Sequence, residues 1–117
     1  MSMQTLTSEI ELLERITGPA LLVLYGGAHC GVCQAIRPRI EALVAEHFGA
    51  VDLAYVDCAA APAVCAQQGV FSLPVLRLHV EGQLALEYAR IFSLQQVLGD
   101  MERVLALSGN SAAPPRD

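Results

Sequence analysis

Two cysteines, Cys30 and Cys33, stand where an apolar run of the sequence gives way to a helical pattern. The run, residues 20–25 (ALLVLY), is apolar at every position, which is typical of a central strand covered on both faces. Two thiols at the start of a helix can close into a small disulfide ring, and the unpaired N–H groups there stabilise thiolate over thiol. CxxC pairs also occur in zinc sites, so the spacing alone leaves redox chemistry and metal binding open.

The composition limits the classes of protein to which the chain can belong. Its 117 residues suit one domain, and the 54% hydrophobic content with a mean hydropathy of +0.45 is enough for a real core. A net charge of −5, with only 7 Lys and Arg, argues against nucleic acid and anionic membranes as partners. We expect a monomer.

The sequence shows no targeting segment, and its first apolar run is too short to span a bilayer. We therefore expect a cytoplasmic protein. In that compartment the four cysteines are more readily explained as catalytic, metal-binding or free than as structural disulfides.

Helical and strand patterns alternate along the chain, which indicates an α/β fold with a central mixed sheet and helices on both faces. The last two strands are expected to form an antiparallel hairpin around residues 81–83, with Val80 opposite Leu84 and Arg77 opposite Glu87. A single domain is predicted over residues 1–108 and a disordered tail over 109–117. The expected helices cover 9–16, 31–48, 63–68 and 93–107, and the expected strands 20–25, 51–56, 74–80 and 84–88.

Four features together resemble the thioredoxin family. They are the CxxC after a central strand, Pro38 inside the following helix, the Leu73-Pro74 step before the hairpin, and a final amphipathic helix. The resemblance runs from the first helix to about Leu107. It implies a thioredoxin-like fold and a thiol–disulfide oxidoreductase of the protein-disulfide reductase type that contributes to cell redox homeostasis.

The resemblance also implies partners and residue roles. Disulfide-containing client proteins would be the substrates, and a thioredoxin reductase or another thiol donor would supply electrons; no cofactor and no metal are implied. Cys30 resembles the nucleophilic thiol, Cys33 the resolving thiol, and Pro74 the cis-proline that faces them. The rim of the site would be formed by His29, Gly31, Val32, Leu73, Arg90 and Ile91.

The chain departs from the family pattern around this site. The position of the usual buried acid is Leu24, so proton transfer at Cys33 must use water or another group, of which His29 is one candidate. His29 is also explained as an exposed polar residue at a helix start, and Arg90 as a solvated charge at a strand end. Tryptophan is absent, with Gly26 and His29 in the usual places; the motif proline is replaced by Val32, and small residues before the last helix by Arg90 and Ile91.

Cys58 and Cys65 form a possible second thiol pair. A continuous helix would hold them about 10 Å apart, too far for a bond, so the pattern favours two free, semi-buried thiols. A second dithiol requires residues 59–62 to fold Cys65 back toward Cys58.

Two other functions remain open on the sequence. One is a zinc-binding module that uses all four cysteines, although the second pair lacks the usual spacing for such a site. The other is an interaction or chaperone module on the same fold, in which the CxxC is vestigial. The absence of the usual acid and tryptophans is consistent with that alternative.

Overall fold

The computed structural model describes residues 3–108 and has the alternating order that the sequence predicts, with one additional strand at the start. The disordered tail predicted over 109–117 lies outside the described residues, and the domain boundary stays a prediction. The elements are β1 (Gln4–Leu6), α1 (Glu9–Ile16), β2 (Ala20–Gly26), α2 (Gly31–His47), β3 (Asp52–Asp57), α3 (Pro62–Gln67), β4 (Val75–Val80), β5 (Gln83–Ala89) and α4 (Leu94–Ser108).

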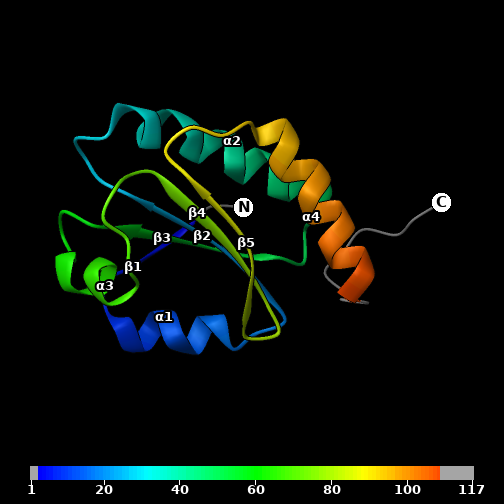
Figure 1. Ribbon diagram of the computed structural model, residues 1–117, viewed down its shortest axis with the longest axis horizontal. Coiled ribbons are helices and arrows are strands. Elements are labelled where there is room, and N and C mark those ends of the chain that lie inside the picture. Colours follow the sequence, from blue (N-terminus) through cyan, green and yellow to red (C-terminus); the bar gives the residue numbers. More distant parts are fainter. Residues whose placement is uncertain (1–2, 109–117) are drawn as a thin grey trace.

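The five strands form one mixed sheet in the order β1-β3-β2-β4-β5. β1 and β2 both pair with β3 in parallel, whereas β2–β4 and β4–β5 are antiparallel. Figure 1 shows α1 and α3 on one side of the sheet and α2 and α4 on the other. All seven residues of β2 are buried, as expected for a strand covered on both faces. The predicted fold class is confirmed.

The alternation of side chains along β2 divides the interior into two cores. Leu22 and Leu24 face α2 and α4, where they pack with Ile40 and Met101. Leu21, Val23 and Tyr25 face the opposite side of the sheet. That second core is completed by Leu12, Ile16, Val64 and Cys65. Because both faces of β2 are buried, packing on either side fixes the position of its C-terminal end, shortly before α2 begins.

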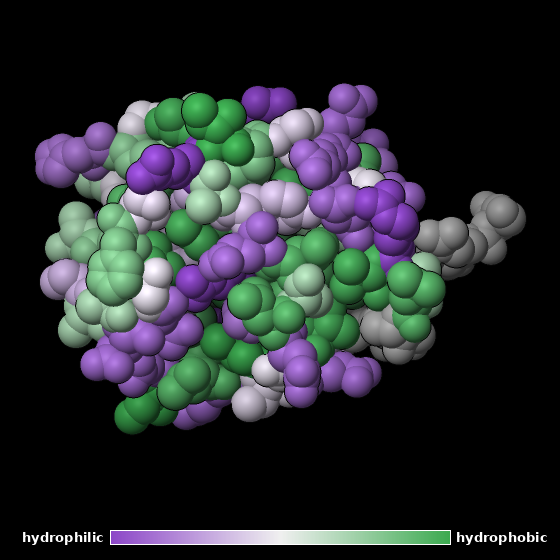
Figure 2. Space-filling view, in the orientation of Figure 1, coloured by the Kyte–Doolittle hydropathy of each residue, from purple (hydrophilic) through white to green (hydrophobic). Residues whose placement is uncertain are grey.

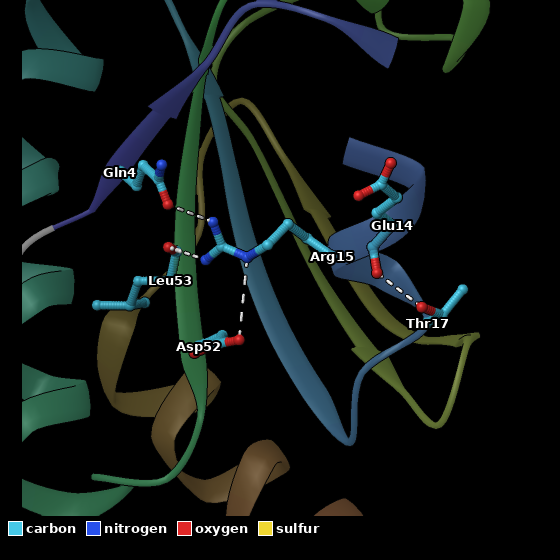
Figure 3. Close-up of polar contacts among 6 residues, drawn as sticks. All are labelled: Gln4, Glu14, Arg15, Thr17, Asp52 and Leu53. Carbon is cyan, nitrogen blue, oxygen red and sulfur yellow. Dashed lines mark hydrogen bonds and ion pairs between the residues drawn. The ribbon is translucent and has the colours of Figure 1, made fainter. Parts of the chain in front are cut away.

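An arginine fixes α1 to the edge of the sheet (Figure 3). Arg15, in the last turn of α1, donates hydrogen bonds to the Gln4 side chain at 2.7 Å and to the Leu53 carbonyl at 2.9 Å. Its guanidinium also lies 3.9 Å from the Asp52 carboxylate. These contacts join β1 and β3 to the helix. The sequence does not predict β1, because three residues are too few to show a periodic pattern.

The β4–β5 hairpin differs from the predicted one in its turn and in its last pairs. Glu81 and Gly82, with φ of 51° and 83°, make a two-residue turn, where a three-residue loop was predicted. Arg77 pairs with Glu87 as predicted, but the register shifts between Leu78 and His79. His79 therefore faces Leu84, and Val80 faces Gln83. The extra residue of a β-bulge accounts for the error, because it changes the pairing without altering the hydrophobic pattern.

β5 is an edge strand of the sheet, and most of its residues are exposed. Figure 2 shows apolar and polar surface interspersed over one face of the molecule. Leu84, near the start of β5, is 52% exposed.

No helix within residues 3–108 has the length and hydropathy needed to cross a membrane.

Candidate active site

Cys30 and Cys33 form a disulfide at the first turn of α2, with their Cα atoms 5.2 Å apart. Cys30 is the N-cap residue of the helix, and its Sγ accepts a hydrogen bond from the Cys33 N–H at 3.2 Å. Cys30 is half-buried, whereas Cys33 is 0% exposed. When the pair is reduced, the N–H group and the helix dipole would both stabilise a Cys30 thiolate. The outer sulfur can therefore meet a partner disulfide while the inner one is shielded.

Gly26, the last residue of β2, leaves the space that this arrangement needs. A Cβ at this position would lie 2.9 Å from the Cβ of Cys33 and 2.9 Å from the Oη of Tyr55. Both contacts are closer than packed side chains allow. Glycine therefore lets β2 run directly beneath the buried cysteine, which explains why no larger side chain occupies this position.

Pro74 lies immediately before β4 and follows a cis peptide bond from Leu73, as expected from the sequence. Its carbonyl oxygen accepts a hydrogen bond from the Arg90 N–H at 2.7 Å. Arg90 has a φ of 66°, a conformation that residues with a Cβ rarely adopt. The end of β5 is thereby held against the residues that precede β4.

The predicted rim residues line two hollows beside the disulfide. The first, of about 370 Å³, brings His29, Cys30 and Leu73 together; the second, of about 230 Å³, joins Val32, Pro74, Arg90 and Ile91. Gly31 is exposed between the two cysteines in the sequence, with open space beside it. Part of this rim is apolar and reaches solvent: Val32 is 54% and Ile91 94% exposed.

Cys58 and Cys65 form a second disulfide, with Cα atoms 5.6 Å apart, so the expectation of two free thiols is wrong. The continuous helix assumed for that expectation does not exist, because α3 begins only at Pro62. Before it, the Asp57 carboxylate accepts hydrogen bonds from the N–H groups of Ala59 and Ala60, at 2.9 and 3.2 Å. This turn brings the chain back on itself. Cys58 lines the same hollow as Cys30.

The structure adds Tyr55 to the site, which sequence reasoning missed. It stands opposite Leu24 in the β2–β3 register, on the same side of the sheet as α2. The side chain is 3% exposed, and its phenolic oxygen has no hydrogen-bond partner among residues 3–108. Burial, and next the negative charge of Asp57, raise the pKa of Tyr55. The signal in the sequence was a lone tyrosine in an apolar strand.

No group of three or more His, Cys, Asp or Glu side chains within the described chain is arranged to share a metal ion. The four cysteines are instead joined as two separate pairs. The four-cysteine arrangement considered from the sequence is therefore not found in this part of the molecule.

The comparisons with known proteins agree with this geometry. The family model described as Thioredoxin matches residues 6–102. The chain is 33% identical to a thioredoxin domain-containing protein 5 homolog of Drosophila melanogaster over 87% of this chain and 26% of the relative. It is also 33% identical to a thioredoxin of Streptomyces clavuligerus, over 55% of this chain and 59% of the relative. The matches thus span about a quarter and about three fifths of the lengths of these two relatives.

Solved structures show the same fold. A mutant thioredoxin from Halobacterium salinarum superimposes with a TM-score of 0.78 over 99% of this chain and 95% of its own, at 19% identity. With the family model matched over nearly the whole described chain, and with a CxxC disulfide at the start of α2, the chain belongs to the thioredoxin family.

Proposed function

We propose that this protein is a thiol–disulfide oxidoreductase that reduces disulfides in client proteins. The observation that carries the proposal is the asymmetry of the Cys30–Cys33 pair. One sulfur is accessible and capped by a backbone N–H at a helix start, and the other is buried a turn further in. That division matches what two successive exchange steps require.

In the proposed reaction the Cys30 thiolate attacks a client disulfide and forms a mixed disulfide, and the other client sulfur leaves as a thiolate. Cys33 then loses its proton and attacks the Cys30 sulfur, which releases the second client thiolate. The dithiol gives two electrons to the client, and Cys30 and Cys33 return to the disulfide form. A thioredoxin reductase or another thiol donor would supply two electrons for the next cycle.

The rim supports a polypeptide client. Leu73 and Cys30 share one hollow, so an extended segment that approaches Cys30 would pass beside the backbone that precedes β4. The exposed side chains of Val32 and Ile91, which line the neighbouring hollow, offer apolar contacts to such a segment. His29 and Arg90 add polar groups at the same rim.

Turnover of insulin disulfides with dithiothreitol as donor tests the proposal. The wild-type protein should accelerate reduction well beyond dithiothreitol alone, and Cys30→Ser should abolish the acceleration. Cys33→Ser is the matched variant: it should stop turnover but trap the client as a covalent mixed disulfide, which Cys30→Ser cannot do. A wild-type rate equal to that of dithiothreitol alone would overturn the proposal and favour the interaction module with a vestigial CxxC.

The wider role follows from this activity. A reductase of protein disulfides would contribute to cell redox homeostasis, with disulfide-containing proteins as its partners. The cytoplasmic location and the monomeric state expected from the sequence stay predictions.

A further inference from the structure

Family members carry an acid at the position of Leu24, and this chain has no ionisable group there. Leu24 is 0% exposed and packs with Ile40 and Leu76 in the core. Cys33 is itself 0% exposed, so when it becomes a thiolate for the second exchange step its charge develops away from solvent. A buried charge without a partner costs far more than one that accepts a hydrogen bond.

The Tyr55 hydroxyl borders the same space as the side chain of Cys33. Its oxygen and the Cys33 Cβ are each 2.9 Å from the point where a Gly26 Cβ would stand, so both face the space left by the glycine. The hydroxyl is also buried and has no hydrogen-bond partner among the described residues. In the disulfide form, then, a buried polar group that faces the same space as the Cys33 side chain is left unsatisfied, which is itself costly.

We infer that Tyr55 donates a hydrogen bond to the Cys33 sulfur when that sulfur is a thiolate, in the place where the family uses an acid. This inference rests on the proposed exchange reaction and deepens it. The step moves no proton to Tyr55: the proton of Cys33 passes to water, and the phenol O–H stabilises the charge that remains on the sulfur. The unsatisfied hydroxyl of the disulfide form thereby gains a partner on reduction.

The surroundings of Tyr55 suit a donor rather than a base. Burial and the Asp57 charge raise the pKa of Tyr55, so the phenol keeps its proton at neutral pH. From α2, the Arg37 guanidinium lies 4.1 Å from the ring centroid and acts in the opposite direction. Gln34 also lowers the pKa of Tyr55, while its side-chain amide donates a hydrogen bond to the Gly27 carbonyl at 3.1 Å.

Asp57 is the rival group, because its carboxylate lies 3.9 Å from the position of a Gly27 Cβ. That oxygen already accepts the two N–H groups of the turn that follows β3. An Asp57→Asn variant keeps an acceptor for the turn and removes the charge, so it separates the two candidates.

The test is Tyr55→Phe, which removes only the hydroxyl and keeps the ring beneath Arg37. Wild-type and variant proteins are equilibrated with glutathione. The fraction of Cys30–Cys33 that is reduced is then measured by alkylation and peptide mass analysis, which reports it separately from the Cys58–Cys65 pair. At a pH above the midpoint of Cys33, where the reduced protein carries a Cys33 thiolate, loss of its hydrogen bond should shift the equilibrium about tenfold toward the disulfide, which is about 30 mV more reducing. In a Cys30→Ser background, the ultraviolet absorbance of the Cys33 thiolate is followed against pH. Tyr55→Phe should move the pH at which half of Cys33 is deprotonated to a higher value.

Tyr25→Phe is the matched control, because Tyr25 has a buried, unpartnered hydroxyl on the opposite side of the sheet, within the described residues. Its glutathione equilibrium should equal that of the wild type. The inference is overturned if Tyr55→Phe leaves both readouts unchanged, if Tyr25→Phe shifts them equally, or if only Asp57→Asn moves the midpoint. No client takes part in these measurements, so they stand even if insulin turnover fails.

Discussion

The Arg90 N–H donates a 2.7 Å hydrogen bond to the Pro74 carbonyl, which joins the end of β5 to the proline that precedes β4. Arg90 makes this bond from a left-handed conformation, φ 66°, in which its Cβ is strained. The position therefore combines a structural constraint with a cationic side chain on the rim, and the two can be separated by substitution.

Arg90→Gly should stabilise the protein by about 0.5–1 kcal/mol, because glycine adopts this conformation without strain and keeps the N–H. Urea unfolding measures the change in the free energy of unfolding. Arg90→Ala is the control, since it removes the charge but keeps the Cβ, and it should give no such gain. Equal stabilisation by both variants would show that the charge, not the backbone, is unfavourable.

The couple formed by Cys30 and Cys33 should be less reducing than that of thioredoxins, which lie at about −270 mV. A stabilised thiolate favours the reduced form, and positive charge from Arg90 or a protonated His29 would act in this direction. We expect a potential between about −270 and roughly −200 mV, measured against glutathione. Arg90→Gln should lower it and Arg90→Lys should not.

The same rim should make the protein a poor substrate for a standard thioredoxin reductase, because its residues differ from the usual docking pattern. Efficient turnover by such a reductase, together with a potential at or below that of thioredoxin, would contradict both expectations.

Reduced protein treated with iodoacetamide near pH 6 should be modified far faster at Cys30 than at Cys33. Cys30 is the helix N-cap and is partly accessible, whereas Cys33 is 0% exposed. Peptide mass analysis over time gives the two rates, and the protein unfolded in urea provides the control in which they should converge. Similar rates in the folded protein would rule out the assignment of roles.

Replacing both Cys58 and Cys65 with serine should lower the free energy of unfolding by about 2–3 kcal/mol. Their disulfide closes the short loop between β3 and α3 and so restricts the unfolded chain. Unfolding of wild-type and variant proteins is compared without reductant and then with dithiothreitol, which should remove most of the difference. A difference that persists in reductant would mean that the serines, not the missing bond, destabilise the core.

His79 should make stability depend on pH. It is buried on the α1 and α3 side of the sheet, with both ring nitrogens unpartnered among the described residues, and burial followed by the Arg77 charge lowers its pKa from 6.5. The unfolded chain therefore binds a proton more readily than the folded one below pH 6.5. The free energy of unfolding should therefore be highest above pH 6.5, and it should fall as the pH drops from 6.5 toward the lower pKa of His79 in the folded protein.

His79→Leu should flatten this dependence in urea unfolding at about pH 7.5 and about pH 5, on either side of the ordinary histidine pKa. The more exposed His47→Gln is the control. An unchanged slope in His79→Leu would assign the acid sensitivity to other groups.

Local patterns in the sequence determined the strands and helices that carry the CxxC, and the placement of Cys30 at a helix start. An apolar run followed by a helical period is encoded by neighbouring residues, and so is the order of βαβ units. Leu73, Pro74 and the other rim residues were assigned through the resemblance to the thioredoxin family, and their roles stay predictions.

Only the tertiary structure decided how distant segments meet. The Cys58–Cys65 bond depends on hydrogen bonds to the Asp57 carboxylate that turn the chain before α3, and helical spacing alone argued against it. The register shift at Leu78 and His79 leaves the apolar pattern unchanged, so it could not be read from the sequence. Tyr55 and Cys33 face the same space because β3 pairs beside β2 and Gly26 has no side chain there, and no local pattern in the sequence records that arrangement.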